Sequence, residues 1–410
     1  MPEHTLALSA AFKRLAWSNL AAQSAEQIGL AAAPLVAVLA LGAGPGATGL
    51  LQTAQTLPFL VLAIPAGLLA DRMSRRRLMV SAEALRAGSL AAILALALGR
   101  WLSLPLLGLL GFAGAAGTVA YGVAAPALVP ALVPPAALAT ANARIELART
   151  VAFAGGPALG GVLVGWTGAA PAFAFAEALS MLAVLLLAGI AEPPRPRLPP
   201  CHPLHDLKEG AAFVFGNALL LPLFMTQLVF NIALFVLLAV YVPYAVHRLG
   251  LSAAAVGVTL ATYGLGMVAG ALLAPRLAGA LRFGTLIAIG PVSGFVASML
   301  MVATLFLPFA ALAGASFFLM GAGPILWVIS TTTLRQAVTP SSLLGRVSAM
   351  YLMAQGARPI GAALGAGIGA TWGAEACLVV AALGFAAQAA VILLSPVPHL
   401  ARQPQVAASG

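Results

Sequence analysis

The sequence predicts an all-α membrane protein in which twelve transmembrane helices form two pseudo-symmetric six-helix bundles. Charged residues make up 7% of the 410-residue chain and apolar residues 62%, whereas a soluble domain carries about 25% charged residues. The apolar runs are continuous over about 20 residues and do not alternate, which selects helices over a barrel. Similar segments also recur about half a chain length apart.

The apolar runs divide the chain into twelve predicted spans separated by short turns. These spans cover residues 14–40, 48–70, 76–99, 103–129, 141–166, 171–191, 218–246, 252–275, 283–305, 308–333, 346–371 and 374–395. The stretch 192–205 differs because it contains six prolines, which disfavour a helix. We therefore expect a bundle over 1–191, a cytoplasmic linker over 192–216 and a second bundle over 217–410. Within the linker, residues 206–215 predict an amphipathic helix lying on the membrane face.

Basic residues are distributed unevenly among the turns. With both termini on one side, 17 of the 20 basic residues fall on that side, and the exceptions are Arg100, Arg248 and Arg358. The positive-inside rule predicts that this side is cytoplasmic. The basic turns on that side account for the net charge of +10. We therefore expect a lipid bilayer, and not a nucleic acid, as the partner of this chain.

The two halves of the chain repeat each other. GLLADR at Gly67 is echoed by ALLAPR at Ala271, and Gln23 and Gln27 are echoed by Gln227 and Asn231 at the same offset. The alternative is chance similarity among Leu/Ala-rich helices. Duplicated halves place a binding site near the membrane midplane, where the repeats face each other.

Polar side chains within the apolar runs mark a candidate cavity, because polar groups are costly in lipid and tend to be functional. In the first span they are spaced by three and four residues, which places them on one helical face. The residues we expect to line the cavity are Asn19, Gln23, Gln27, Gln52, Gln55, Gln227, Asn231 and Arg358.

Glu26 is the candidate proton carrier in this set. It lies about 18 Å along the helix from Arg14, near mid-membrane, at 1.5 Å per residue. Desolvation at that depth favours the neutral carboxylic acid, so that Glu26 could load and release a proton. The alternative is a structural glutamate that holds two helices together.

Arg358 is a cation inside the eleventh span and needs a partner or a water-filled cavity. It could attract an anionic substrate or balance Glu26. If the span begins later, its side chain only reaches back to the cytoplasmic surface. Two further pairs, Glu83 with Arg86 and Glu146 with Arg149, have the spacing of local helix pairs. We expect them near the cytoplasmic ends, without contact to substrate.

The turn GLLADRMSRRR, residues 67–77, resembles the loop 2–3 signature of the major facilitator superfamily, G-x-L-x-D-R-x-G-R-R, with Ser74 at the glycine position. The resemblance implies a conformational latch between the two halves, formed by Gly67, Asp71, Arg72, Arg75 and Arg76. Asp71 could bind the N-terminus of a neighbouring helix, and Gly67 would let that helix approach closely. The alternative is an ordinary basic cytoplasmic loop.

The fifth span contains Gly156, Pro157, Gly160 and Gly161, and this G-P-x-x-G-G pattern resembles the antiporter motif of exporters in the superfamily. Proline removes one helix hydrogen bond, and the glycines let a second helix lie against the bend. Small-residue packing of an ordinary kind would give the same pattern.

Together with the stretch 338–346 and Ala141-Asn142, these motifs resemble the branch of enterobactin exporters and macrolide or multidrug efflux proteins. The resemblance implies a monomeric transporter in the bacterial inner membrane that exports a small amphipathic molecule, such as a drug or siderophore, by proton antiport and alternating access. The alternative is a lysophospholipid or other lipid flippase, or a facilitator without proton coupling. No phosphate-binding loop, metal-ligand cluster or catalytic triad occurs, so neither an enzyme nor a cofactor or metal is expected.

Overall fold

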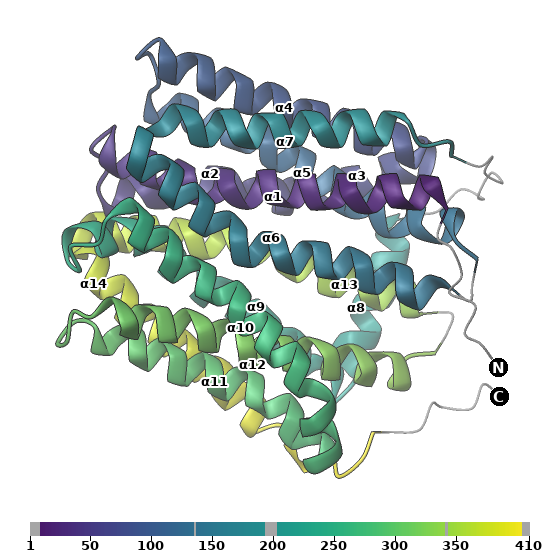
Figure 1. Cartoon of the computed structure of the whole chain (residues 1–410). Helices are drawn as coiled ribbons and strands as arrows, with labels where there is room; N and C mark the ends of the chain where they lie inside the picture. The colour runs from purple at the N-terminus through teal and green to yellow at the C-terminus, as the bar shows by residue number, and fades with distance from the viewer. Residues whose placement is uncertain (1–8, 135–136, 193–202, 341–342, 404–410) are drawn as a thin grey trace.

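The computed structural model describes residues 9–134, 137–192, 203–340 and 343–403, and these residues form helices and no strand. Most of the helices run side by side along one direction (Figure 1). In chain order they are α1 (Ala10–Leu39), α2 (Pro45–Val61), α3 (Ala63–Arg72), α4 (Arg75–Leu98), α5 (Leu104–Leu132), α6 (Leu138–Thr167), α7 (Ala169–Ala188), α8 (Pro203–Gly216), α9 (Leu220–His247), α10 (Ala253–Ala280), α11 (Phe283–Ala303), α12 (Ala310–Val338), α13 (Leu344–Met353), the 3₁₀ turn η2 (Ala354–Gly356), α14 (Ala357–Leu393) and η3 (Val397–His399). The all-helical class predicted from composition is confirmed.

Several helices begin where the sequence supplies a cap. The hydroxyl oxygen of Ser9 accepts a hydrogen bond from the Phe12 N–H at the start of α1. Ser74 does the same for Arg77 at the start of α4. A serine oxygen at this position satisfies one of the N–H groups that the first turn leaves without a partner.

Ten stretches of the described residues are long and apolar enough to cross a membrane. The predicted second span is divided into α2 and α3, and the helix is interrupted at Leu62 between them. The reason is that Pro65 has no N–H to donate to the carbonyl of Val61. The predicted eleventh and twelfth spans form one stretch that bends at Gly373, where φ is 81°. The count of twelve spans stays a prediction.

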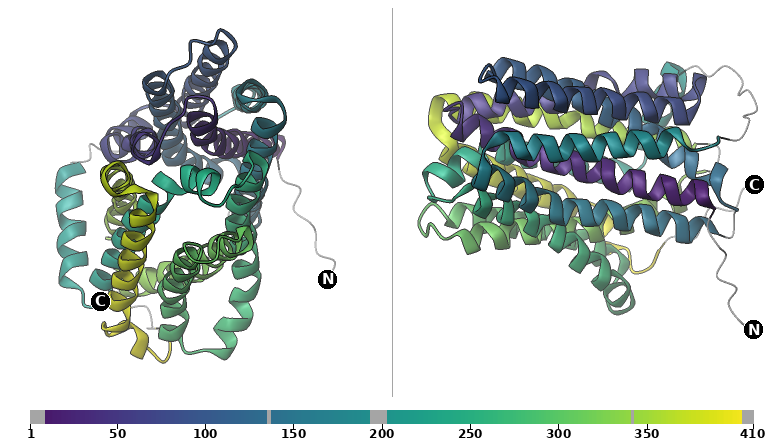
Figure 2. Two further views of the ribbon diagram at one scale, coloured as in Figure 1. Left: turned by 90° about the vertical axis from the view of Figure 1, so that its left-hand side faces the viewer. Right: turned by 45° about the horizontal axis from the view of Figure 1, so that its top comes forward.

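The helices lie in two groups, seen along their length in Figure 2. In the first group α1 packs on α6 and α7, and α4 packs on α5 and α7. In the second group α9 packs on α14, and α12 packs on α10 and α11. The main contacts between the groups join α6 to α10 and α2 to α14. This grouping agrees with the expected two bundles, whose residue boundaries stay a prediction.

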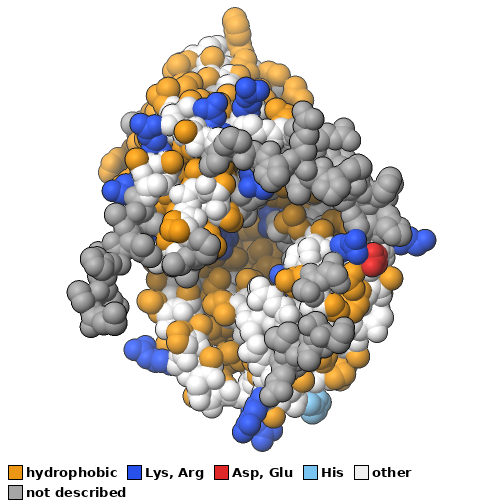
Figure 3. Space-filling view, turned by 90° about the vertical axis from the view of Figure 1, so that its right-hand side faces the viewer, with side chains coloured by type: hydrophobic (Ala, Val, Ile, Leu, Met, Phe, Trp, Pro, Cys, Tyr) orange, Lys and Arg blue, Asp and Glu red, His pale blue; other side chains and the backbone are white. Residues whose placement is uncertain are grey.

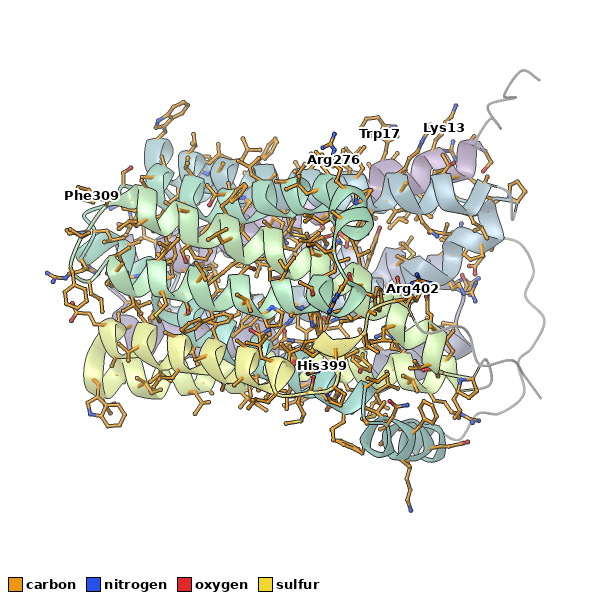
Figure 4. The ribbon with its side chains drawn as sticks, turned by 90° about the horizontal axis from the view of Figure 1, so that it is seen from below. Lys13, Trp17, Arg276, Phe309, His399 and Arg402 are labelled. Atoms are coloured by element: carbon orange, nitrogen blue, oxygen red, sulfur yellow. The ribbon has the colours of Figure 1, made fainter. Side chains whose placement is uncertain are left out.

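The two ends of the bundle differ in charge. Lys13, Arg276 and Arg402 lie toward the end at which α1 begins, which we call the basic end (Figure 4). Phe309 lies at the opposite end, which we call the far end. This distribution agrees with the bias found in the sequence, while the assignment of the basic end to the cytoplasm stays a prediction.

The two groups meet at the far end through backbone contacts that only glycine permits. A Cβ atom at Gly257 of α10 would lie 2.5 Å from the Pro157 carbonyl oxygen of α6. A Cβ atom at Gly49 of α2 would lie 2.5 Å from the Ala366 Cα of α14. Such distances are well inside van der Waals contact, so these helices lie against each other with no room for a side chain.

Helix α8 crosses the long helices and packs against α13 (Figure 1). The Arg346 Nη1 atom lies 2.7 Å from Glu209 Oε2, and Val214 is fully buried. Helix α8 covers the segment 206–215, for which the sequence predicts a helix, while its amphipathic role and its position on the membrane face stay predictions. Most of the proline-rich linker, residues 193–202, lies outside the described residues.

Candidate functional site

A cavity of about 370 Å³ lies between the two helix groups. From the basic end the molecule is hollowed, with hydrophobic walls and Lys or Arg side chains in its depth (Figure 3). Six residues that the sequence marked as polar groups within spans line the cavity. They are Glu26, Gln27, Gln52, Gln55, Asn231 and Arg358.

Three other residues expected at the cavity are not among those that line it. Asn19 is buried, and its amide nitrogen donates to the Ile145 carbonyl of α6 at 3.3 Å. Gln227 donates to the Tyr351 carbonyl of α13 at 3.0 Å. Gln23 is only partly buried on α1. Asn19 and Gln227 therefore join neighbouring helices in this conformation.

Glu26 belongs to a buried cluster around Arg86. Arg86 Nη1 lies 2.6 Å from Glu83 Oε1, and Arg86 Nη2 lies 3.6 Å from Glu26 Oε2. Arg86 Nη2 also donates to the Thr118 hydroxyl at 2.7 Å, while the Ser180 hydroxyl donates to Glu83 at 2.9 Å. One guanidinium is thus shared by two carboxylates, of which Glu83 is fully buried and Glu26 borders the cavity.

The position of this cluster corrects the expectation for Glu83 and Arg86. They form the local pair that their spacing predicts, but the pair is buried within the bundle, and Arg86 lines the cavity. Since α4 begins at Arg75, Arg86 lies about three turns inside the helix. Counting residues from the basic turn at 75–77 to Arg86 could have predicted that Arg86 lies inside the bundle. Within the described part of the chain, no three His, Cys, Asp or Glu side chains form a metal site.

Arg149 also lines the cavity, contrary to the expectation of a pair remote from substrate. Its guanidinium binds the Glu146 carboxylate through Nε and Nη2, with a shortest distance of 2.6 Å. The same guanidinium lies over the Phe153 ring at 5.5 Å, and that ring contacts Tyr263 across the two groups. Arg149 therefore lines the cavity while it is paired with Glu146, which is not among the lining residues.

Arg358 reaches the cavity from the first turn of α14, directly after η2. Its Nε atom donates to the Asn231 side-chain oxygen at 3.3 Å. Its guanidinium carbon lies 4.8 Å from the centre of the Phe59 ring and 5.6 Å from that of Phe235. Among the described residues no carboxylate lies within ion-pair distance of it, so Arg358 and Glu26 form no direct ion pair, and the balance between their charges stays a prediction.

The glycines of the G-P-x-x-G-G motif place α6 between two helices. A Cβ atom at Gly156 would lie 2.4 Å from the Gln27 Cβ of α1, and one at Gly160 would lie 3.0 Å from the Ile28 carbonyl oxygen. On the other side, a Cβ atom at Gly161 would lie 2.5 Å from the Ala253 carbonyl oxygen of α10. The motif therefore brings together one helix from each group beside the cavity.

Two adjacent glycines give a matched test of this packing. We expect Gly156→Ala to destabilise the protein by about 1–3 kcal/mol, because the added methyl group must displace the Gln27 side chain or α1. Gly155→Ala should be tolerated, since a Cβ atom there meets nothing within 4 Å. Thermal unfolding of the purified variants measures both effects. Equal melting temperatures for the two variants would contradict the close packing at Gly156.

The structure describes part of the GLLADRMSRRR motif, residues 67–77. The side chains of Asp71 and Arg72 lie outside the described residues, so the latch stays a prediction. Helix α3, which carries them, packs mainly on α2 and α5 of its own group. A Cβ atom at Gly67 would meet nothing within 4 Å. Among the described residues, the close approach expected at Gly67 is not formed in this structure.

The basic tail of the motif joins α4 to the end of α7. Arg76 Nη1 donates to the Ala188 and Ile190 carbonyls at 3.1 and 3.2 Å, which places a cation at a helix C-terminus. The Glu192 carboxylate accepts hydrogen bonds from the Ser74 hydroxyl and from the Arg75 and Arg76 N–H groups. Sequence reasoning missed Glu192, whose partners lie more than 110 positions away.

A family of transmembrane secretion effectors matches residues 9–409 of the chain. The enterobactin exporter EntS of Escherichia coli O6:K15:H31 is 29% identical over 360 residues, covering 84% of this chain and 82% of the relative. EntS of Citrobacter koseri is 30% identical over 316 residues, covering 74% and 72%. The relatives are thus matched over most of their own length.

Solved transporter structures share the fold. A bacterial homolog of the human lysosomal transporter Spinster, in an inward-facing and unoccupied conformation, aligns with a TM-score of 0.73 over 98% of this chain and all of the other, at 15% identity. The nucleoside transporter NupG aligns with a TM-score of 0.74 over 94% of this chain and 99% of the other, at 12% identity. At these identities the likeness shows the fold alone.

Proposed function

Since the chain belongs to the transmembrane secretion effector family of the major facilitator superfamily, we propose that it exports a small amphipathic molecule across the bacterial inner membrane by proton antiport and alternating access. The similarity to enterobactin exporters supports the direction of transport. The cavity supports a small and largely apolar solute, since most of its lining is hydrophobic.

The main support for proton exchange is that Glu26 borders the cavity and shares Arg86 with Glu83. When Glu26 takes up a proton, Arg86 keeps its nearer counter-ion, Glu83, at 2.6 Å. Protonation therefore leaves no unpaired charge behind, which would otherwise cost several kcal/mol in a buried site. When Glu26 releases the proton, Arg86 is close enough to stabilise the new carboxylate. Proton exchange at this position is thus compatible with a stable bundle in both charge states.

Alternating access requires two ends that close in turn. In this structure the groups meet at the far end, where Gly257 lies against α6 and Gly49 lies against α14, and the hollow opens at the basic end (Figure 3). We propose that Asp71 locks the basic end when the cavity faces the far end. The packing of α3 within its own group supports a latch that is released in the present conformation. In this proposal the basic end is cytoplasmic and a monomer performs the cycle.

The proposal is tested by transport against a pH gradient. Thermal-shift screening of the purified protein against siderophores, macrolides and lysolipids identifies a compound that binds. Inverted membrane vesicles with an acidic interior should then accumulate this compound, and nigericin, which collapses the gradient, should stop the accumulation. Accumulation that is equally fast without the gradient would contradict proton antiport and favour a facilitator or lipid flippase.

A further inference from the structure

We propose that the exported molecule is an organic anion, a carboxylate or a similarly acidic group on an apolar body, and that its anionic group binds Arg358. This inference rests on the proposed export function and names the substrate class of the same cavity.

Among the described residues that line the cavity, Arg358 is the arginine without a counter-ion at ion-pair distance. The arginines found there are Arg86, Arg149 and Arg358. Arg86 has two carboxylates, at 2.6 and 3.6 Å, and Arg149 binds Glu146 at 2.6 Å. Within the described residues, Arg358 has neither an ion pair nor a hydrogen bond beyond the one to Asn231.

The groups that hold Arg358 orient it without neutralising its charge. Asn231 contributes one neutral acceptor at 3.3 Å and is itself held by its amide bond to the Gln227 carbonyl at 2.9 Å. Phe59 and Phe235 contribute ring faces, whose attraction for a cation is smaller than the desolvation penalty of a buried ion. The Nη groups donate to no described residue. They are therefore available to an anion, for which a guanidinium offers paired donors.

The surroundings of Arg358 also favour an apolar body next to the anionic group. Phe59 and Phe235 line the same cavity, as do Phe230 and Tyr263. Gln55 lies one helical turn before Phe59, is 5% exposed, and its side-chain oxygen has no hydrogen-bond partner among the described residues. A ligand that carries a hydrogen-bond donor as well as its anionic group could therefore bind both Gln55 and Arg358.

An anionic substrate has a consequence for the driving force. When an anion leaves the cell and one or more protons enter, both movements make the cell interior more positive. Export is then driven by the interior-negative membrane potential as well as by the pH gradient, whatever the proton stoichiometry. The exchange of a monovalent cation for one proton would move no net charge and would not respond to the potential.

The binding test uses three probes with the same ring system: 2-naphthoate, 2-naphthamide and 2-naphthylmethylammonium. The full-length protein in phosphatidylcholine nanodiscs is titrated with each probe by calorimetry. We expect the carboxylate to bind about tenfold more tightly than the amide, as one charge-assisted hydrogen bond would give, and the ammonium to bind most weakly. Equal affinities, a preference for the ammonium, or no binding of the carboxylate would overturn the proposal.

Variants locate the preference at Arg358. Arg358→Gln should abolish the difference in affinity between carboxylate and amide. Arg358→Lys keeps the positive charge and should retain part of that difference, and it serves as the test if the glutamine variant fails to fold. Arg335→Gln is the matched control, since Arg335 also lies over a ring, that of Tyr351 at 4.7 Å, and does not line the cavity. A preference for the carboxylate that persists in Arg358→Gln would overturn the assignment.

Transport separates this inference from the proposed function. In inverted vesicles an interior-positive potential, imposed by a potassium gradient and valinomycin without a pH gradient, should drive uptake of 2-naphthoate. Uptake driven by the potential but never by a pH gradient would refute proton antiport and leave the anion assignment standing. Uptake of the amide or ammonium driven by a pH gradient, with no preference for the carboxylate, would refute the anion assignment alone.

Discussion

Replacing Glu26 with glutamine is expected to reduce pH-gradient-driven export to the level of vesicles without the protein. Glutamine has nearly the shape of a protonated glutamate but cannot release a proton, so the cycle would stop at the step that needs an ionised carboxylate. Arg86 keeps Glu83 at 2.6 Å, and we therefore expect the variant to fold and to bind substrate as the parent does. Accumulation in inverted vesicles measures export, and calorimetry measures binding.

Glu177→Gln is the control for this experiment. Glu177 is also a glutamate inside a long apolar helix, α7, but it does not line the cavity. Its replacement should leave export unchanged. Export by Glu26→Gln at the parent rate would remove Glu26 from the mechanism, and an equal loss in Glu177→Gln would show that the effect is not specific to the cavity.

The largest effect on stability is expected for Arg86→Gln. Removing this guanidinium leaves the fully buried Glu83 carboxylate without its counter-ion and Glu26 without its ion pair. Breaking a buried pair by removal of one partner costs about 3–5 kcal/mol. The melting temperature of the purified variant should therefore fall steeply.

The double variant Glu83→Gln/Arg86→Gln tests the reason for that loss. It removes both charges of the close pair and leaves neutral amides that can hydrogen-bond to each other and to the Ser180 hydroxyl, which donates to Glu83 in the parent. We expect it to recover a large part of the lost stability. A double variant as unstable as Arg86→Gln would show that packing, and not the unpaired carboxylate, sets the loss.

The sequence was sufficient for the fold because membrane helices are specified by composition. Continuous apolar runs with basic turns leave helices as the main solution in lipid, and the described residues form helices at nearly all the expected positions. The exact helix ends were harder to predict. Pro65 lies within an apolar run, where helices from neighbouring segments can compensate for a proline, so the break before α3 depends on packing that the sequence does not display.

The candidate site was predictable where polar residues interrupt an apolar run. Glu26, Gln55 and Arg358 are of this kind, and all three line the cavity. Arg86 was misplaced because its spacing from Glu83 is equally typical of a surface pair. The contact between Glu192 and the start of α4 joins segments far apart in the chain, and no local pattern encodes it.

Two distances, each between a pair of spin labels at one end of the bundle, test the central claim of alternating access most directly. In a variant with Cys201 and Cys377 replaced by serine, spin labels at 144 and 276 report on the basic end, and labels at 166 and 306 report on the far end. The account predicts that protonation and substrate change the two distances in opposite directions, one shortening as the other lengthens. Two distances that stay fixed, or that lengthen and shorten together, would contradict it.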